Sequence, residues 1–227
     1  MQWFAQDSAA SIASTDETPF DFSADPDSDD ADASTIPPLS NYFWYYMMGN
    51  VGFVGYSGAH TYEETLPYIQ DACTWASGQN MDALILLGHW NSASFGCDAD
   101  MTVSAVFESM RAEPACAGVA DRMKYFVGHS HCNIVLEENT GFMVGGQGMS
   151  DTHCGGDFGI PVLDTTGGRL KVYFFPIQQH RGYTYYQDTL QCIKNNGISG
   201  CYNMATLWAD VPLSYITAGT SLQQLAK

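Results

Sequence analysis

The sequence predicts an α/β fold, and three segments carry this prediction. Residues 81–87 and 124–128 are short apolar runs with the length of buried strands, and each leads into a Gly-His pair. Residues 101–112 lie between them and suggest a helix. Strands alternating with helices build a sheet whose carboxyl edge collects the functional loops. The chain has 227 residues, 45% of them hydrophobic, which is enough for one core.

Two aromatic and apolar stretches, 42–48 and 51–56, precede these strands. They flank Gly49-Asn50, a two-residue turn of the kind found in β-hairpins. The sequence therefore predicts an antiparallel hairpin at the start of the folded region.

A helix is predicted from Thr61 to about Ser77. Thr61 is a favourable N-cap, and the acidic residues Glu63 and Glu64 favour the positive end of the helix dipole. Pro67 is compatible with this helix only near its first turn. The expected apolar face consists of Leu66, Ile69, Cys73 and Ala76.

Short strands are expected after residue 131, near 132–137, 141–145, 160–164 and 169–175. Turns at Asn139-Thr140-Gly141 and Thr166-Gly167-Gly168 separate two pairs of them. After residue 186 the sequence pattern predicts no further helix or strand.

Charge and composition divide the chain into three regions. Residues 1–40 carry nine acidic and no basic residues and are predicted to be a disordered acidic insert; 41–185 form the folded domain, and 186–227 form a C-terminal extension. The net charge of −17 argues against nucleic acid and anionic membranes as partners. No stretch reaches 18 apolar residues, so no membrane span is expected.

Three of the six histidines form the most informative pattern. Gly128-His129-Ser130-His131 follows one predicted strand, and Gly88-His89 follows another. Imidazoles in loops after strands can turn toward a common metal ion, and neutral imidazole is a ligand for Zn, Fe, Cu and Ni. His89, His129 and His131 are therefore the candidate metal ligands.

The segments around these histidines resemble a known superfamily. Residues 81–91 and 124–133 resemble the last two metal-binding motifs of the calcineurin-like metallophosphoesterases, which include the purple acid phosphatases. The strand and glycine turn at 142–148 continue the resemblance, which covers residues 42–176. It implies a metallophosphoesterase-type β-sandwich flanked by helices, and a phosphatase that hydrolyses small phosphate monoesters.

The resemblance also implies a ligand assignment. His89 and His129 would bind one metal ion and His131 a second. In the complete family site the two ions, Zn, Fe or Mn, neutralise the phosphoryl oxygens and activate a water for in-line attack.

The family's earlier motifs are an Asp-x-His, a Gly-Asp-x-x-Asp and a Gly-Asn-His-Asp or Gly-Asn-His-Glu, and we expect none of them in this chain. We therefore expect a chain that begins in the middle of the domain, so that the fold is incomplete on its N-terminal side. Without a bridging carboxylate two dications repel each other, so at most one metal ion is expected. Asp98, Asp100 and Asp151 lie near the motifs in the sequence and are alternatives for the missing carboxylate, although solvated loop carboxylates are the favoured interpretation. The chain alone is expected to be inactive or weakly active.

Seven cysteines favour an oxidising compartment, which makes the parent protein a candidate for secretion. Cys192 and Cys201 bracket Asn195-Asn196-Gly197 and are expected to form a disulfide. Two further pairings stay open at this point, Cys97 with Cys116 and Cys132 with Cys154.

Two alternatives come from other functional classes. One is a non-catalytic binding protein on a degenerate phosphoesterase half-fold, which presents the aromatic residues of 42–46 or 183–186 to a partner. The other is a structural zinc protein that uses His129, His131 and Cys132.

Overall fold

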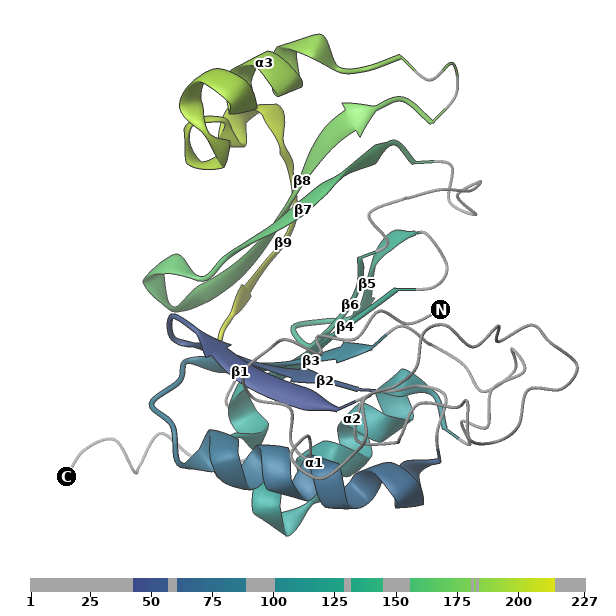
Figure 1. Cartoon of the computed structure of the whole chain (residues 1–227), viewed down its shortest axis with the longest axis vertical. Helices are drawn as coiled ribbons and strands as arrows, with labels where there is room; N and C mark the ends of the chain where they lie inside the picture. Colours follow the sequence, from purple (N-terminus) through teal and green to yellow (C-terminus); the bar gives the residue numbers. More distant parts are fainter. Residues whose placement is uncertain are drawn as a thin grey trace, which may run out of the picture.

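A six-stranded mixed sheet forms the centre of the molecule, with its strands in the order β1-β2-β3-β4-β6-β5. The computed structural model describes residues 43–56, 61–88, 101–128, 132–144, 156–180, 182 and 184–214. Within them, two sheets and three helices give a mixed α/β fold (Figure 1). The predicted α/β class is confirmed, whereas the acidic region 1–40 lies outside the described residues.

The predicted hairpin is confirmed at one margin of this sheet. Strand β1 (Trp44–Met48) pairs antiparallel with β2 (Val51–Gly55). Gly49 has a φ of 62° in the connecting turn, a conformation that glycine adopts without strain.

Four strands of the sheet run parallel. They are β2, β3 (Ala83–Gly88), β4 (Met123–Val127) and β6 (Gly141–Val144). Strand β5 (Asn133–Glu137) closes the other margin, antiparallel to β6. Both predicted strands that lead into Gly-His pairs are therefore neighbours in the interior of the sheet.

Helix α1 (Tyr62–Ser77) begins as predicted. The Thr61 hydroxyl accepts a hydrogen bond from the Glu64 amide, and the Glu64 carboxylate accepts one from the Thr61 amide, which completes a capping box. The predicted apolar face is partly wrong, because Thr65 is buried and Leu66 is only half-buried. Pro67 is the sixth helical residue, beyond the first turn, and it is tolerated on the exposed side.

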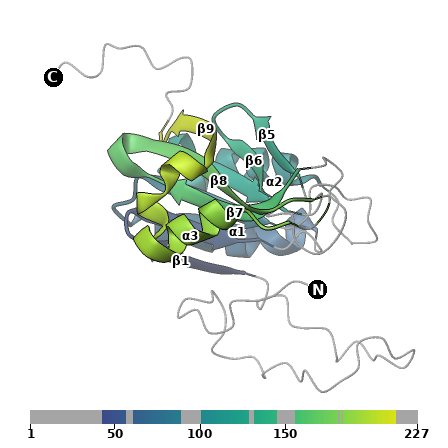
Figure 2. The same cartoon turned by 90° about the horizontal axis from the view of Figure 1, so that it is seen from above.

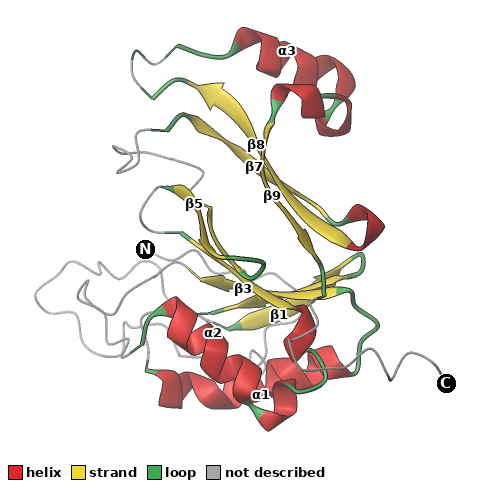
Figure 3. Ribbon diagram, turned by 180° about the vertical axis from the view of Figure 1, so that it is seen from behind, coloured by secondary structure: helices red, strands yellow, loops and turns green. Residues whose placement is uncertain are grey.

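Helices α1 and α2 (Val103–Ala112) cover the outer face of the six-stranded sheet (Figure 3). Ile69 of α1 and Phe107 of α2 are fully buried in the core that they share with the sheet. A disulfide between Cys73 and Cys116 ties α1 to the turn that follows α2. The alternative pairing of Cys97 with Cys116 is therefore wrong.

A second, antiparallel sheet covers the inner face. It contains β7 (Phe158–Asp164), β8 (Arg169–Gln178) and β9 (Thr206–Pro212), in that order. Buried residues of the two sheets share one core, which includes Ile85 and Phe126 from the first sheet and Val172 from the second. Figure 2 shows the three-stranded sheet over the middle of the molecule, with β1 and β5 at opposite margins.

The chain after residue 186 contributes to this second layer. Helix α3 (Gln187–Asn196) lies on the outer side of the three-stranded sheet, and β9 is that sheet's third strand (Figure 1). The predicted disulfide between Cys192 and Cys201 is confirmed. No helix in the described residues is long and apolar enough to cross a membrane.

Candidate metal centre at the carboxyl edge of the sheet

The carboxyl ends of the parallel strands meet at one edge of the six-stranded sheet. Gly88 is the last residue of β3, and Gly128 directly follows β4. The Gly128 amide donates a hydrogen bond to the Gly88 carbonyl at 3.0 Å. On the other side of β3, the Tyr56 amide donates to the Leu87 carbonyl at 2.9 Å. Strands β2, β3 and β4 therefore end side by side.

The three candidate ligands follow this edge in the sequence. His89 directly follows Gly88, and His129 directly follows Gly128, while His131 is two residues further on. All three side chains lie outside the described residues. The structure brings together the residues that precede two of them, since Gly88 and Gly128 are hydrogen-bonded neighbours.

Side-chain packing at this edge explains why β3 ends in glycine. A Cβ atom on Gly88 would lie 3.3 Å from the Tyr56 ring, closer than an ordinary van der Waals contact. Tyr56 is buried and packs edge-on against Phe43. Glycine at position 88 therefore lets the tyrosine cover the end of β3 just before His89.

The segment after β6 begins at the same edge, and one tripeptide in it corrects the expectation that the family's earlier motifs are absent from the chain. It contains Asp151-Thr152-His153, the one Asp-x-His tripeptide in the chain, downstream of the family-like motifs instead of upstream. These residues also lie outside the described ones. The signal that singles them out is their place after a parallel strand, which becomes clear only when β6 is known to pair with β4.

Within the described residues, no group of three or more His, Cys, Asp or Glu side chains is arranged to hold a metal ion. Cys132 is disulfide-bonded, so its sulfur is not a zinc ligand and the structural zinc alternative is wrong in that respect. The proposed partner, Cys154, lies outside the described residues.

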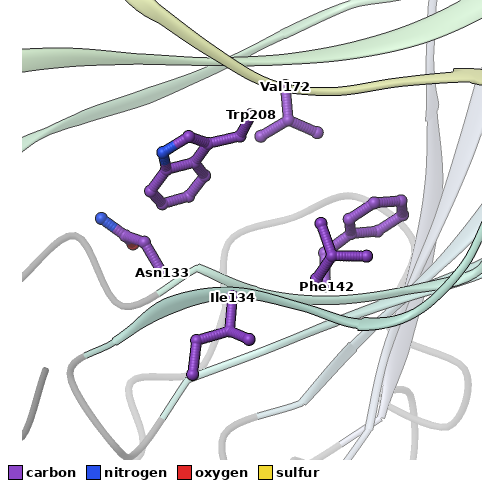
Figure 4. A pocket seen from close by; sticks show the side chains of 6 residues that line it. Asn133, Ile134, Phe142, Val172 and Trp208 are labelled. Atoms are coloured by element: carbon purple, nitrogen blue, oxygen red, sulfur yellow. The ribbon is translucent and has the colours of Figure 1, made fainter.

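A cavity of about 140 Å³ lies between the two sheets beside this edge. Asn133, Ile134, Val135 and Phe142 line it from β5 and β6, and Val172 and Trp208 line it from the second sheet (Figure 4). The indole of Trp208 stacks on Phe174 with 5.1 Å between ring centroids. The cavity wall is thus largely apolar, with one carboxamide, that of Asn133.

A carboxylate in the second sheet was not anticipated from the sequence. Asp157 accepts hydrogen bonds from the Tyr186 hydroxyl at 2.6 Å and from the His180 backbone amide at 3.2 Å. The hydrogen bond to Asp157 raises the pKa of Tyr186. These contacts hold the chain between β8 and α3 against the start of β7. No local pattern in the sequence predicts them.

Three rings of the aromatic stretches considered as a partner surface contact neighbours within the molecule, whereas Tyr185 is 52% exposed and Tyr183 lies outside the described residues. Tyr45 stacks on Trp75 of α1 at 4.4 Å between centroids, and Tyr46 stacks on Phe53 at 5.5 Å. Tyr186 is held by Asp157. These rings therefore contribute to the packing of the fold itself.

No protein-family model matches the chain, and comparisons with curated proteins and with solved structures found no match either.

Proposed function

We propose that this chain carries part of the site of a metal-dependent phosphoesterase, which in its complete form hydrolyses phosphate monoesters in the manner of an acid phosphatase. The observation that supports the proposal is the hydrogen bond between Gly128 and Gly88. Because of this contact, the two Gly-His pairs leave the sheet from neighbouring parallel strands, as ligands of one centre require.

His89, His129 and His131 would hold the metal. Three imidazoles form a ligand set that suits Zn²⁺ and leaves a fourth position open. A bound ion would supply Lewis acidity and would lower the pKa of a water that it binds. The protein's part is to position the imidazoles, and the rigid ends of β3 and β4 provide a firm base for this.

The chain by itself is proposed to be inactive or weakly active. Three neutral imidazoles bring no negative charge, so one dication is favoured over two. With a single ion, the clamp that neutralises the phosphoryl oxygens from both sides is missing. Asp151 is the carboxylate that the sequence places nearest to this edge, after β6.

Hydrolysis of p-nitrophenyl phosphate tests this assignment, with Zn²⁺, Mn²⁺ or Fe²⁺ added in turn. We expect turnover at or near the background rate, and binding of inorganic phosphate only when metal is present. Substituting His129→Ala should abolish this phosphate binding. If phosphate binds equally well without metal and in His129→Ala, the proposed phosphoesterase function is overturned. If the wild type turns over substrate substantially and His129→Ala does not, only the proposed inactivity of the chain is overturned.

A further inference from the structure

The cavity between the two sheets lies close to the proposed metal centre. Asn133 pairs with Val144 at the carboxyl end of β6, and β6 pairs in parallel with β4 up to Val127 and Met143. Asn133 is therefore level with Gly128 and two strands away from β4. Adjacent strands are about 4.8 Å apart, so the separation is about 10 Å, the scale of a small substrate.

The size and lining of the cavity suit a single aromatic ring. An apolar cavity of roughly 150 Å³ in another protein stays dry and binds benzene, and the volume here is about 140 Å³. Figure 4 shows the Trp208 indole and Val172 on one side, opposite Asn133 and Phe142 on the other, while the Ile134 side chain points away from them. Aromatic side chains on both walls favour stacked or edge-on contacts with a ring between them.

The entrance is open to solvent along β5. Val135 lines the cavity and is 45% exposed, so the cavity reaches solvent at this strand. Phe142 and Val172, deeper in the cavity, are buried. A ring can therefore enter from the β5 side and contact a buried apolar floor. The Asn133 carboxamide, which follows His131 by two residues in the sequence, is the polar side chain among the residues that line the cavity.

We propose that this cavity holds the leaving group of the substrate, and that the substrate class is phosphate monoesters of a single-ring phenol. The assignment rests on the proposed phosphoesterase function, because the phosphoryl group must reach the centre at Gly88 and Gly128. Hydrolysis breaks the bond between phosphorus and the aryl oxygen, water supplies the new oxygen on phosphorus, and the phenol leaves with a proton.

Ligand-observed NMR and calorimetry with phenol test the cavity without any need for turnover. Val135→Phe fills the entrance from an exposed edge position, and it should weaken phenol binding at least tenfold. Ile160→Phe is the matched control, since Ile160 is 44% exposed on β7 and does not line the cavity. It should leave phenol binding unchanged. Trp208→Ala provides a second variant, which should also weaken binding.

The same titrations with phenyl phosphate and ethyl phosphate in the presence of Zn²⁺ link the cavity to the centre. Phenyl phosphate should bind at least tenfold more tightly than either ethyl phosphate or phenol. If phenol does not bind, or binds equally well to Val135→Phe, the leaving-group site is overturned whatever the metal does. If phenol binds at the cavity but Zn²⁺ gives phenyl phosphate no advantage over phenol, the proposed function fails and with it the substrate class.

Discussion

The two faces of the six-stranded sheet are covered in different ways. On the outer face, α1 and α2 cover a large core, and the Cys73–Cys116 disulfide ties α1 to the turn that follows α2. On the inner face, three strands share a smaller core and leave a cavity of about 140 Å³ that opens along β5. The difference indicates that the outer layer supplies stability, while the inner layer leaves room for a ligand near the carboxyl edge.

Removing the outer disulfide should have the largest effect on stability. Cys73 and Cys116 are 43 residues apart, so the chain-entropy relation gives about 4 kcal/mol for this cross-link. Cys192 and Cys201 are 9 residues apart, and the same relation gives about 2.7 kcal/mol. Denaturant unfolding of the two double Cys→Ala variants compares them. A larger loss for the Cys192–Cys201 variant would contradict the view of the outer layer as the main source of stability.

Truncation of core side chains should show the same asymmetry. Met110 of α2 is fully buried, and Met110→Ala should cost about 2–5 kcal/mol. Val135 lines the cavity but is 45% exposed, so Val135→Ala should cost less than about 1 kcal/mol. The measurement is the urea concentration at the midpoint of unfolding, compared between variants with the same dependence of the unfolding free energy on urea. Equal losses at the two sites would mean that the inner layer is packed as firmly as the outer one.

Lys124 makes the inner layer sensitive to pH. It is fully buried on β4, and its amine donates to the Asn139 carbonyl at 2.8 Å. Burial lowers the pKa of this amine to about 8, and the Arg111 guanidinium acts in the same direction. Between pH 8 and the ordinary lysine pKa the unfolded chain binds more protons than the folded one, so stability rises with pH.

The expected gain from pH 8 to 10 is on the order of 2 kcal/mol. Above pH 10 the trend reverses, because the pKa values of Tyr62 and Tyr125 are raised to about 12 and the unfolded chain then loses protons first. Unfolding free energies at several pH values measure the curve, with Lys124→Met as the comparison. A Lys124→Met protein that keeps the same rise between pH 8 and 10 would show that another group causes it.

A further small effect is expected at the start of α1. Thr61→Ala removes the hydroxyl that caps the helix and leaves the Glu64 amide without this acceptor. The loss should be about 1 kcal/mol. Thr61→Ser keeps the hydroxyl and should recover most of the stability in thermal unfolding. If both variants lose equally, the cap contributes through its methyl group instead.

Local patterns in the sequence predicted the elements that depend on nearby residues. The turn at Gly49-Asn50, the cap at Thr61 and the short loop between Cys192 and Cys201 are all local, and the structure confirms them. The same holds for β3 and β4. The continuous apolar run of β3 fits a strand buried on both faces, and every residue of β4 is buried, Lys124 included.

Long-range pairing could not be predicted in the same way. Strand β9 pairs with β8, although α3 lies between them in the sequence. No pattern in residues 206–212 predicts β8 as the neighbouring strand. The pairing of Cys73 with Cys116 is equally non-local, since spacing alone does not determine connectivity. The cavity depends on the pairing of β9 with β8, because Trp208 reaches it only once β9 has joined the second sheet.

Equilibrium binding of Zn²⁺ to the chain tests the central claim most directly, by calorimetry and by metal analysis after dialysis. We predict one bound ion per chain in the wild type, and loss of that ion in the His89→Ala, His129→Ala double variant. His180→Asn, a histidine of the second sheet layer, should leave Zn²⁺ binding unchanged. Zn²⁺ binding that persists in the double variant, or none in the wild type, would contradict a metal centre at the ends of β3 and β4.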